Sequence, residues 1–255
     1  MRFASLGSGS RGNALVVEAG RTRVMVDCGF AHSETVMRLQ RIGCAVEDID
    51  AIIVTHEHDD HVGGVARFAS RLGIPVYLTP GTFAAVAGKF EQVQSRCFDP
   101  HAPFALGDLM VQPFPVPHDA REPAQMVFDD GKHRFGILTD VGASTPHIRA
   151  MLSGCSALML ECNHDAALLR DGPYPPSLKA RIGSRFGHMR NEDTAELLAA
   201  LDNTKLRHVV AAHLSDTNNT PQLARNALAM ALGARPDEVM VATQEEGTRG
   251  WIGLD

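Results

Sequence analysis

The chain has 255 residues, of which 44% are hydrophobic and 21% charged, a composition typical of a globular α/β protein. Its net charge of -6 excludes general electrostatic attraction to nucleic acid, so that such a partner would need a local basic patch or bound metal. The five cysteines are scattered and never spaced as Cys-x-x-Cys, which argues against disulfides and thiolate zinc sites. With no signal-type or membrane-spanning apolar run, we expect a cytoplasmic protein without a membrane partner.

The N-terminal segment contains a glycine-rich loop. Residues 3–6 are predicted to form a strand that leads into residues 7–13, GSGSRGN, which match the dinucleotide-binding pattern G-x-G-x-x-G. That pattern requires a following helix, whereas residues 14–18 and 23–27 are predicted strands, so we interpret the loop as a hairpin connection. It forms either a plain tight turn or an anion nest that holds a phosphate through its backbone amides and the side chains of Ser8, Ser10, Arg11 and Asn13.

Residues 52–64, IIVTHEHDDHVGG, carry the densest chemistry of the chain. An apolar run at residues 51–54 predicts a buried strand, and Val65, Phe68 and Leu72 share one face of a predicted helix that follows. The turn between strand and helix is where α/β folds place ligand sites. This turn carries four potential metal ligands: His56, His58, Asp60 and His61. The alternative is a polar turn that is only solvated.

Three further potential ligands lie at the ends of apolar runs that are predicted to be strands. His118, Asp140 and His213 each follow an apolar run that would deliver them to the same edge of the fold. Imidazole nitrogens and carboxylate oxygens suit zinc or manganese, and the spacing of His56 to His61 suits a pair of ions. Asp140 is the natural bridge, because its carboxylate has two oxygens to share.

The two halves of the chain resemble each other. Residues 23–29 and 51–59 match residues 135–142 and 157–165, strand for strand, with a predicted helix between each pair. In this register Asp27 corresponds to Asp140 and His58 to His164. The pattern predicts two ββαβ halves whose sheets pack face to face with helices outside, unless the similarity is a chance one.

Basic residues concentrate in residues 170–190, where a proline-rich stretch from residue 171 to residue 187 is predicted to be mostly loop. Ser33 is predicted to cap a helix that ends at Gly43, and Asn191 a helix that continues to Leu201. The basic stretch is either an ordinary solvated loop or a groove that binds substrate through Arg170, Tyr174, Lys179, Arg181 and Arg185.

These residues together resemble the five motifs of the metallo-β-lactamase superfamily: Asp27, then His56, His58, Asp60 and His61, then His118, then Asp140, then His213. The resemblance implies a single domain over residues 1–255, with a four-layer αββα sandwich and two divalent metal ions, zinc or manganese. It also implies that Asp27 orients a ligand histidine by a hydrogen bond, and that Asp60 serves the catalytic centre as a ligand.

Within this superfamily the chain resembles the YycJ (WalJ) branch, through the strings at residues 7–13, 160–165, 172–179, 187–193 and 212–215. The resemblance implies a 5′ to 3′ DNA exonuclease, related to ribonuclease Z and ribonuclease J, that uses a hydroxide bridging the metals. His188 is expected to be the general acid, and His164 to support the ligands or contact substrate. The alternative is a small-molecule metallohydrolase acting on a cyclic phosphodiester, thioester or lactone.

Overall fold

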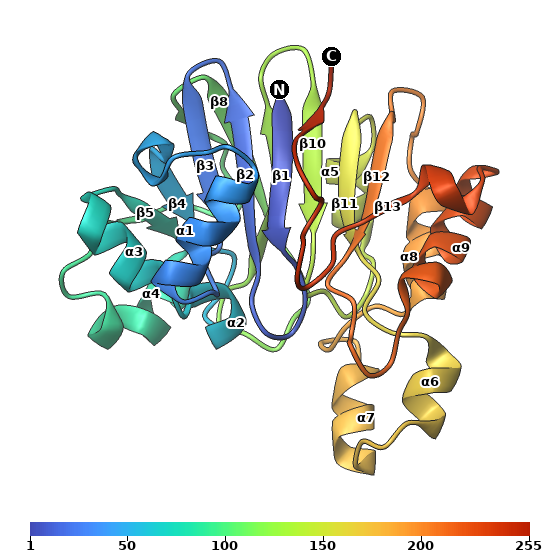
Figure 1. Cartoon of the computed structure of the whole chain (residues 1–255). Helices are drawn as coiled ribbons and strands as arrows, with labels where there is room; N and C mark the ends of the chain where they lie inside the picture. Colours follow the sequence, from blue (N-terminus) through green and yellow to red (C-terminus); the bar gives the residue numbers. More distant parts are fainter.

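The computed structural model describes residues 1–255 and consists of two seven-stranded sheets packed face to face (Figure 1). The first sheet contains, in spatial order, β14 (Ile252–Gly253), β1 (Arg2–Gly7), β2 (Ala14–Ala19), β3 (Thr22–Val26), β4 (Ala51–Ile53), β5 (Val76–Leu78) and β6 (Ser95–Cys97). The second contains β13 (Met240–Val241), β12 (His208–Ala212), β11 (Ala157–Glu161), β10 (Arg134–Leu138), β9 (Ala124–Asp129), β8 (Leu109–Pro115) and β7 (Phe104–Leu106).

Helices cover the outer face of each sheet. The first sheet is covered by α1 (His32–Arg41), α3 (Val65–Leu72) and α4 (Pro80–Val86), and the second by α5 (Pro146–Leu152), α8 (Asn191–Ala199) and α9 (Pro221–Leu232). Three further helices lie at one end of the sandwich: α2 (Asp59–Val62), α6 (Ala166–Asp171) and α7 (Pro176–Ile182). The predicted four-layer αββα architecture is therefore confirmed. None of the helices has the length and apolar character that a bilayer crossing requires.

The apolar core lies in three layers, one between the sheets and one beneath each set of helices. Phe3 of β1 stacks on Phe135 of β10 across the central layer, with ring centroids 3.9 Å apart. Both rings are fully buried, which contributes roughly 1.5–3 kcal/mol for each side chain. This packing fixes the two sheets relative to each other and so brings the ends of their strands together.

The similarity between the two halves of the sequence is also present in the strand pairing of the two sheets. In the first half, β2 pairs with β3 antiparallel, and β3 pairs with β4 parallel across α1. In the second half, β9 and β10 pair antiparallel, and β10 pairs with β11 parallel across α5. The carboxyl ends of β3, β4, β10, β11 and β12 all point to the same end of the sandwich, where parallel strands of α/β folds place their ligand sites.

The segment between β11 and α8 is more helical than the sequence predicted. Residues 166–187, which we call the α6–α7 arm, extend from the body of the molecule (Figure 1) and contain α6, which the sequence did not predict, and α7, which lies where a loop was expected. Proline begins α7, at a position where its missing N–H has no intrahelical partner. The prolines of this segment thus start a helix as well as interrupt one.

Both predicted caps are wrong by one or two residues. Helix α1 begins at His32 after Ala31, so Ser33 lies inside its first turn. Helix α8 begins at Asn191 after Arg190, and the Asn191 amide donates to Asn219 Oδ1 at 3.0 Å. Asn191 therefore joins α8 to the chain before α9 and does not cap its own helix.

Gly29 provides a close backbone contact that supports the functional end of the sandwich. A Cβ atom at Gly29 would overlap the carbonyl oxygen of Asp60 in α2. We therefore expect Gly29→Ala to lower the free energy of unfolding by about 2–3 kcal/mol, as overpacked sites do, and to displace Asp60. Chemical denaturation measures the effect. Gly88→Ala is the matched control, because no atom lies within 4 Å of its new Cβ, and equal stability of the two variants would contradict this account.

Candidate metal centre

Seven predicted ligand side chains converge at this end of the sandwich. His56, His58 and His118 form one group, with His58 Nδ1 lying 3.0 Å from His56 Nε2 and 3.3 Å from His118 Nε2. Asp60, His61 and His213 form a second, in which Asp60 Oδ2 lies 3.4 Å from His61 Nε2 and 3.6 Å from His213 Nε2.

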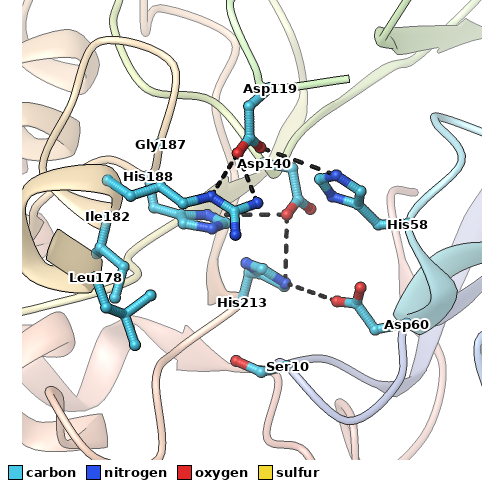
Figure 2. A pocket seen from close by; sticks show the side chains of 11 residues that line it. Ser10, His58, Asp60, Asp119, Asp140, Leu178, Ile182, Gly187, His188 and His213 are labelled. Carbon is cyan, nitrogen blue, oxygen red and sulfur yellow. Dashed lines mark hydrogen bonds and ion pairs between the residues drawn. The ribbon is translucent and has the colours of Figure 1, made fainter. Parts of the chain in front are cut away.

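Asp140 lies between the two groups. Its Oδ2 is 3.1 Å from His61 Nε2, and its Oδ1 is 3.5 Å from His213 Nε2 and 3.9 Å from His118 Nε2. Figure 2 shows the carboxylates of Asp60 and Asp140 pointing toward the ring of His213. Asp140 thus lies between the two groups, where a carboxylate with the bridging role that the sequence predicts would have to lie.

Strained backbone turns position two of the ligands, Asp140 and His213, and also Asp27. Asp27 and His213 directly follow β3 and β12, Asp140 lies two residues after the end of β10, and the φ angles of Asp27, Asp140 and His213 are 58°, 52° and 53°. Such left-handed conformations are uncommon outside glycine and cost of order 1–3 kcal/mol. The surrounding hydrogen bonds must therefore hold them, as is common where backbone geometry serves a site.

Asp27 orients one ligand of each group from behind, His61 directly and His56 through Thr55. Its Oδ2 lies 2.8 Å from His61 Nδ1, and its Oδ1 accepts the backbone N–H of Thr55 at 2.8 Å. The Thr55 hydroxyl donates to the same carboxylate and lies 3.0 Å from His56 Nδ1. Carboxylates that hold ligand imidazoles in this way fix their orientation and raise their basicity.

Glu161 performs the same task for the second half, and the sequence analysis missed it. Its Oε1 lies 3.0 Å from His213 Nδ1 and 2.8 Å from His188 Nδ1, and its carboxylate also accepts the backbone N–H groups of Asp140, Val141 and Met189. Burial raises the pKa of Glu161, but the two imidazoles outweigh this effect and lower it to about 2. The available signal was a lone acid at the end of an otherwise apolar strand.

The glycine-rich loop supports the ligands from the other side. Asn13 Nδ2 donates to Asp60 Oδ2 at 3.2 Å, and the hydroxyl of Ser8 accepts the backbone N–H of His213 at 2.9 Å. The structure favours the tight turn over the anion nest, because five amides of the loop already donate within the protein: Ser8, Gly9, Arg11, Gly12 and Asn13. Only Ser10 of this loop lines the cavity beside the ligands.

The donor set fits divalent cations. Asp140 Oδ2 and His213 Nε2 are buried without hydrogen-bond partners, although such atoms are normally satisfied. Burial lowers the pKa of His213, but Asp140, Asp60 and Glu161 outweigh it and raise the pKa to about 10. The carboxylates thus attract positive charge strongly, and the imidazoles supply the nitrogen ligands that zinc and manganese accept.

A cavity of about 190 Å³ opens beside the ligands. His188 lines it and is about a fifth exposed, and burial lowers its pKa less than Glu161 and Asp140 raise it. The cavity is also lined by Leu178, Arg181 and Ile182 of α7 and by Asp119, which directly follows His118. Asp119 faces His58 in Figure 2, and it was not among the predicted residues.

The other predicted substrate residues lie outside the cavity lining. Arg11 pairs with Asp216 and Glu245, Arg170 pairs with Asp171, and Lys179 Nζ donates to the carbonyl of Arg170. Arg185 has no acidic partner and lies over the Phe186 ring, and Tyr174 is half-buried in the turn between α6 and α7.

His164 also lies apart from the two groups of ligands. It is buried, its Nδ1 is 3.4 Å from Asn163 Oδ1, and burial lowers its pKa to about 4. Its backbone carbonyl accepts the N–H of Asn191 at the start of α8. His164 therefore follows β11 as His58 follows β4, in agreement with the similarity of the two halves. Unlike His58, however, it does not belong to either group of candidate ligands.

Glu161→Gln tests the orienting role of that carboxylate. The amide would point an N–H₂ group at groups that already donate, so we expect metal affinity of the Asp60, His61 and His213 group to fall about 10- to 100-fold. Calorimetric titration with zinc or manganese measures the loss, with thermal unfolding as a check on folding. Glu91→Gln, at an exposed position, is the control, and wild-type affinity in Glu161→Gln would contradict the role.

Comparisons with known proteins agree with this geometry. A family model described as the beta-lactamase superfamily domain matches residues 22–214. Exodeoxyribonuclease YycJ of Bacillus anthracis is 34% identical over 235 residues, covering 91% of this chain and 89% of the relative. Exodeoxyribonuclease WalJ of Streptococcus pneumoniae is 33% identical over 239 residues, covering 90% and 89%.

The fold is also that of known structures. The Zn(2+)-bound PqqB of Methylobacterium extorquens superimposes with a TM-score of 0.75 at 18% identity, over 99% of this chain and 100% of PqqB. The resemblance expected from the five motifs is thereby confirmed. The chain belongs to the metallo-β-lactamase superfamily and, within it, to the family of the YycJ and WalJ proteins.

Proposed function

We propose that this metal-dependent hydrolase is a phosphodiesterase acting on nucleic acid, and specifically a 5′ to 3′ DNA exonuclease. The observation that carries the proposal is the cluster of seven candidate ligand side chains, four of which line one cavity, in a chain similar to two exodeoxyribonucleases over about nine-tenths of its length. The family leaves the metal open, and the nitrogen and oxygen donors suit zinc or manganese. The five free cysteines support a cytoplasmic location.

The ligand residues would hold two ions, one at His56, His58 and His118 and the other at Asp60, His61 and His213, with Asp140 shared. When bound, such a pair lowers the pKa of water and neutralises the charge that develops on a phosphoryl group. The protein's own contribution is to keep the imidazoles oriented, through Asp27 and Glu161, and to limit the space in front of them.

His188 is the proposed general acid for the leaving 3′ oxygen. Glu161 lies 2.8 Å from its Nδ1, which orients the ring and leaves Nε2 as the atom that can donate a proton to substrate in the cavity. The raised pKa of His188 keeps this proton available near neutral pH. Arg181 and Ser10 line the same cavity and are the proposed phosphate contacts.

The size of the cavity favours a strand end over an intact duplex. Its volume of about 190 Å³ is below the range of roughly 300–1,000 Å³ usual for sites that enclose a whole small-molecule ligand. A phosphoryl group and its sugar suit such a space. The lining is mostly polar, which favours an anionic ligand over the apolar thioester or lactone of the alternative reading.

Product analysis tests the proposed function directly. We expect the purified protein with manganese to release mononucleotides from the 5′ end of 5′-phosphorylated DNA, and Asp140→Asn to lose at least about 100-fold in rate, because the shared ligand is weakened. Products from 5′-end-labelled and 3′-end-labelled strands are resolved on denaturing gels. Internal nicks, or cleavage of a generic phosphodiester without cleavage of DNA, would contradict exonuclease activity.

The role of His188 is tested by changing the leaving group. We expect His188→Gln to lower kcat on DNA about 100- to 10,000-fold, because a positioned acid contributes this much when the leaving oxygen needs a proton. On bis(p-nitrophenyl) phosphate the leaving group departs without a proton, so the same variant should lose less than about tenfold. Equal losses on both substrates would show that His188 supports the site in another way.

A further inference from the structure

We propose that Asp119 and Arg181 form a latch across the cavity. In this latch the Asp119 carboxylate holds the Arg181 guanidinium until a substrate phosphate replaces the carboxylate. The inference rests on the proposed function and adds to it a residue with no assigned role. Asp119 acts through Arg181 and is therefore a positioning residue.

The contacts of Asp119 place it between the arm and the ligands. Its Oδ2 accepts from Arg181 Nε at 2.7 Å and from Nη2 at 2.6 Å. Its Oδ1 lies 3.4 Å from His118 Nε2 and 3.9 Å from His58 Nε2. One carboxylate thus separates the guanidinium from the metal-binding imidazoles, at the point where a phosphoryl group would have to enter.

The latch connects two parts of the centre that are far apart in sequence. Asp119 directly follows the ligand His118, whereas Arg181 belongs to α7, none of whose residues is buried. The carbonyl of Ile182, the last residue of α7, accepts the backbone N–H of His188 at 2.8 Å. The ion pair therefore holds the arm near the ligands, and the arm in turn contacts the backbone of the proposed acid.

The chemistry of the pair suits an exchange of partners. A guanidinium binds carboxylate and phosphate oxygens with the same planar set of donors. The Arg181 side chain is 63% exposed and that of Asp119 31%, and exposed ion pairs of this kind contribute little to stability. A phosphodiester oxygen in the cavity would replace the Asp119 carboxylate on the guanidinium, and Arg181 would then bind the phosphodiester.

A double-mutant cycle on the metal-loaded enzyme tests the latch. With 5′-phosphorylated single-stranded DNA, we expect Arg181→Met to raise KM about fivefold and Asp119→Asn to lower it about threefold, with kcat within about twofold. In the Arg181→Met background, Asp119→Asn should leave KM unchanged, because the residue that it holds is absent. The cycle isolates the coupling between the two side chains.

Two outcomes would overturn the latch. If Asp119→Asn lowers KM equally in both backgrounds, the carboxylate only repels substrate. If the Asp119→Asn variant loses bound metal, as measured by atomic emission on the dialysed protein, Asp119 is a metal ligand. The control is Asp193→Asn, whose partner Arg190 lies outside the cavity lining and whose exposure of 33% is similar, and its KM should not change.

Hydrogen exchange provides a measurement that does not depend on DNA cleavage. Asp119→Asn should increase amide exchange in residues 176–182 of the metal-loaded protein, and thymidine 5′-monophosphate should restore protection there only when Arg181 is present. Unchanged exchange in the variant would overturn the latch even if DNA is cleaved as proposed. A wild-type enzyme that cleaves no DNA but shows this pattern would instead overturn the exonuclease proposal alone.

Discussion

A buried carboxylate, Asp140, imposes the constraint on which this end of the molecule depends. Its side chain is only 3% exposed and lies within 4 Å of imidazole nitrogens on His61, His118 and His213. Burying an unpaired charge is costly, so the anion requires positive partners on several sides. Those partners come from both halves of the chain, so the same electrostatic requirement brings both sheets to one centre and creates a site with affinity for cations.

The strained turns show how the fold meets this requirement. At Asp27, Asp140 and His213 the backbone N–H is in each case held by a specific acceptor: the carbonyl of Ile53, the carboxylate of Glu161 and the hydroxyl of Ser8. These acceptors offset the cost of the left-handed conformation. The supporting residues are therefore as much a part of the centre as the ligands, and each belongs to a neighbouring strand or loop.

The convergence of the candidate ligands could be predicted from sequence because they are polar residues that follow apolar strands. Glu161 also ends an apolar strand, but its role was missed because it depends on the approach of His188 and His213, which are 27 and 52 residues away. Helix α7 was missed because its prolines indicated loop, whereas two of them precede and begin the helix. Local propensity also failed at Ser33, which lies inside the first turn of α1, and at Asn191, whose amide donates to Asn219 instead of capping α8.

Nucleic-acid recognition in this acidic protein cannot rest on a broad basic surface. The arginines that suggested a basic groove are mostly neutralised, Arg170 by Asp171 and Arg181 by Asp119. A long strand would therefore gain little from counterion release along the surface. Attraction must be concentrated at the cavity, where the buried carboxylates would hold cations that attract the phosphate and where a guanidinium can exchange one anion for another. Such a centre favours the end of a strand, because an end can enter a small polar cavity without the rest of the duplex following.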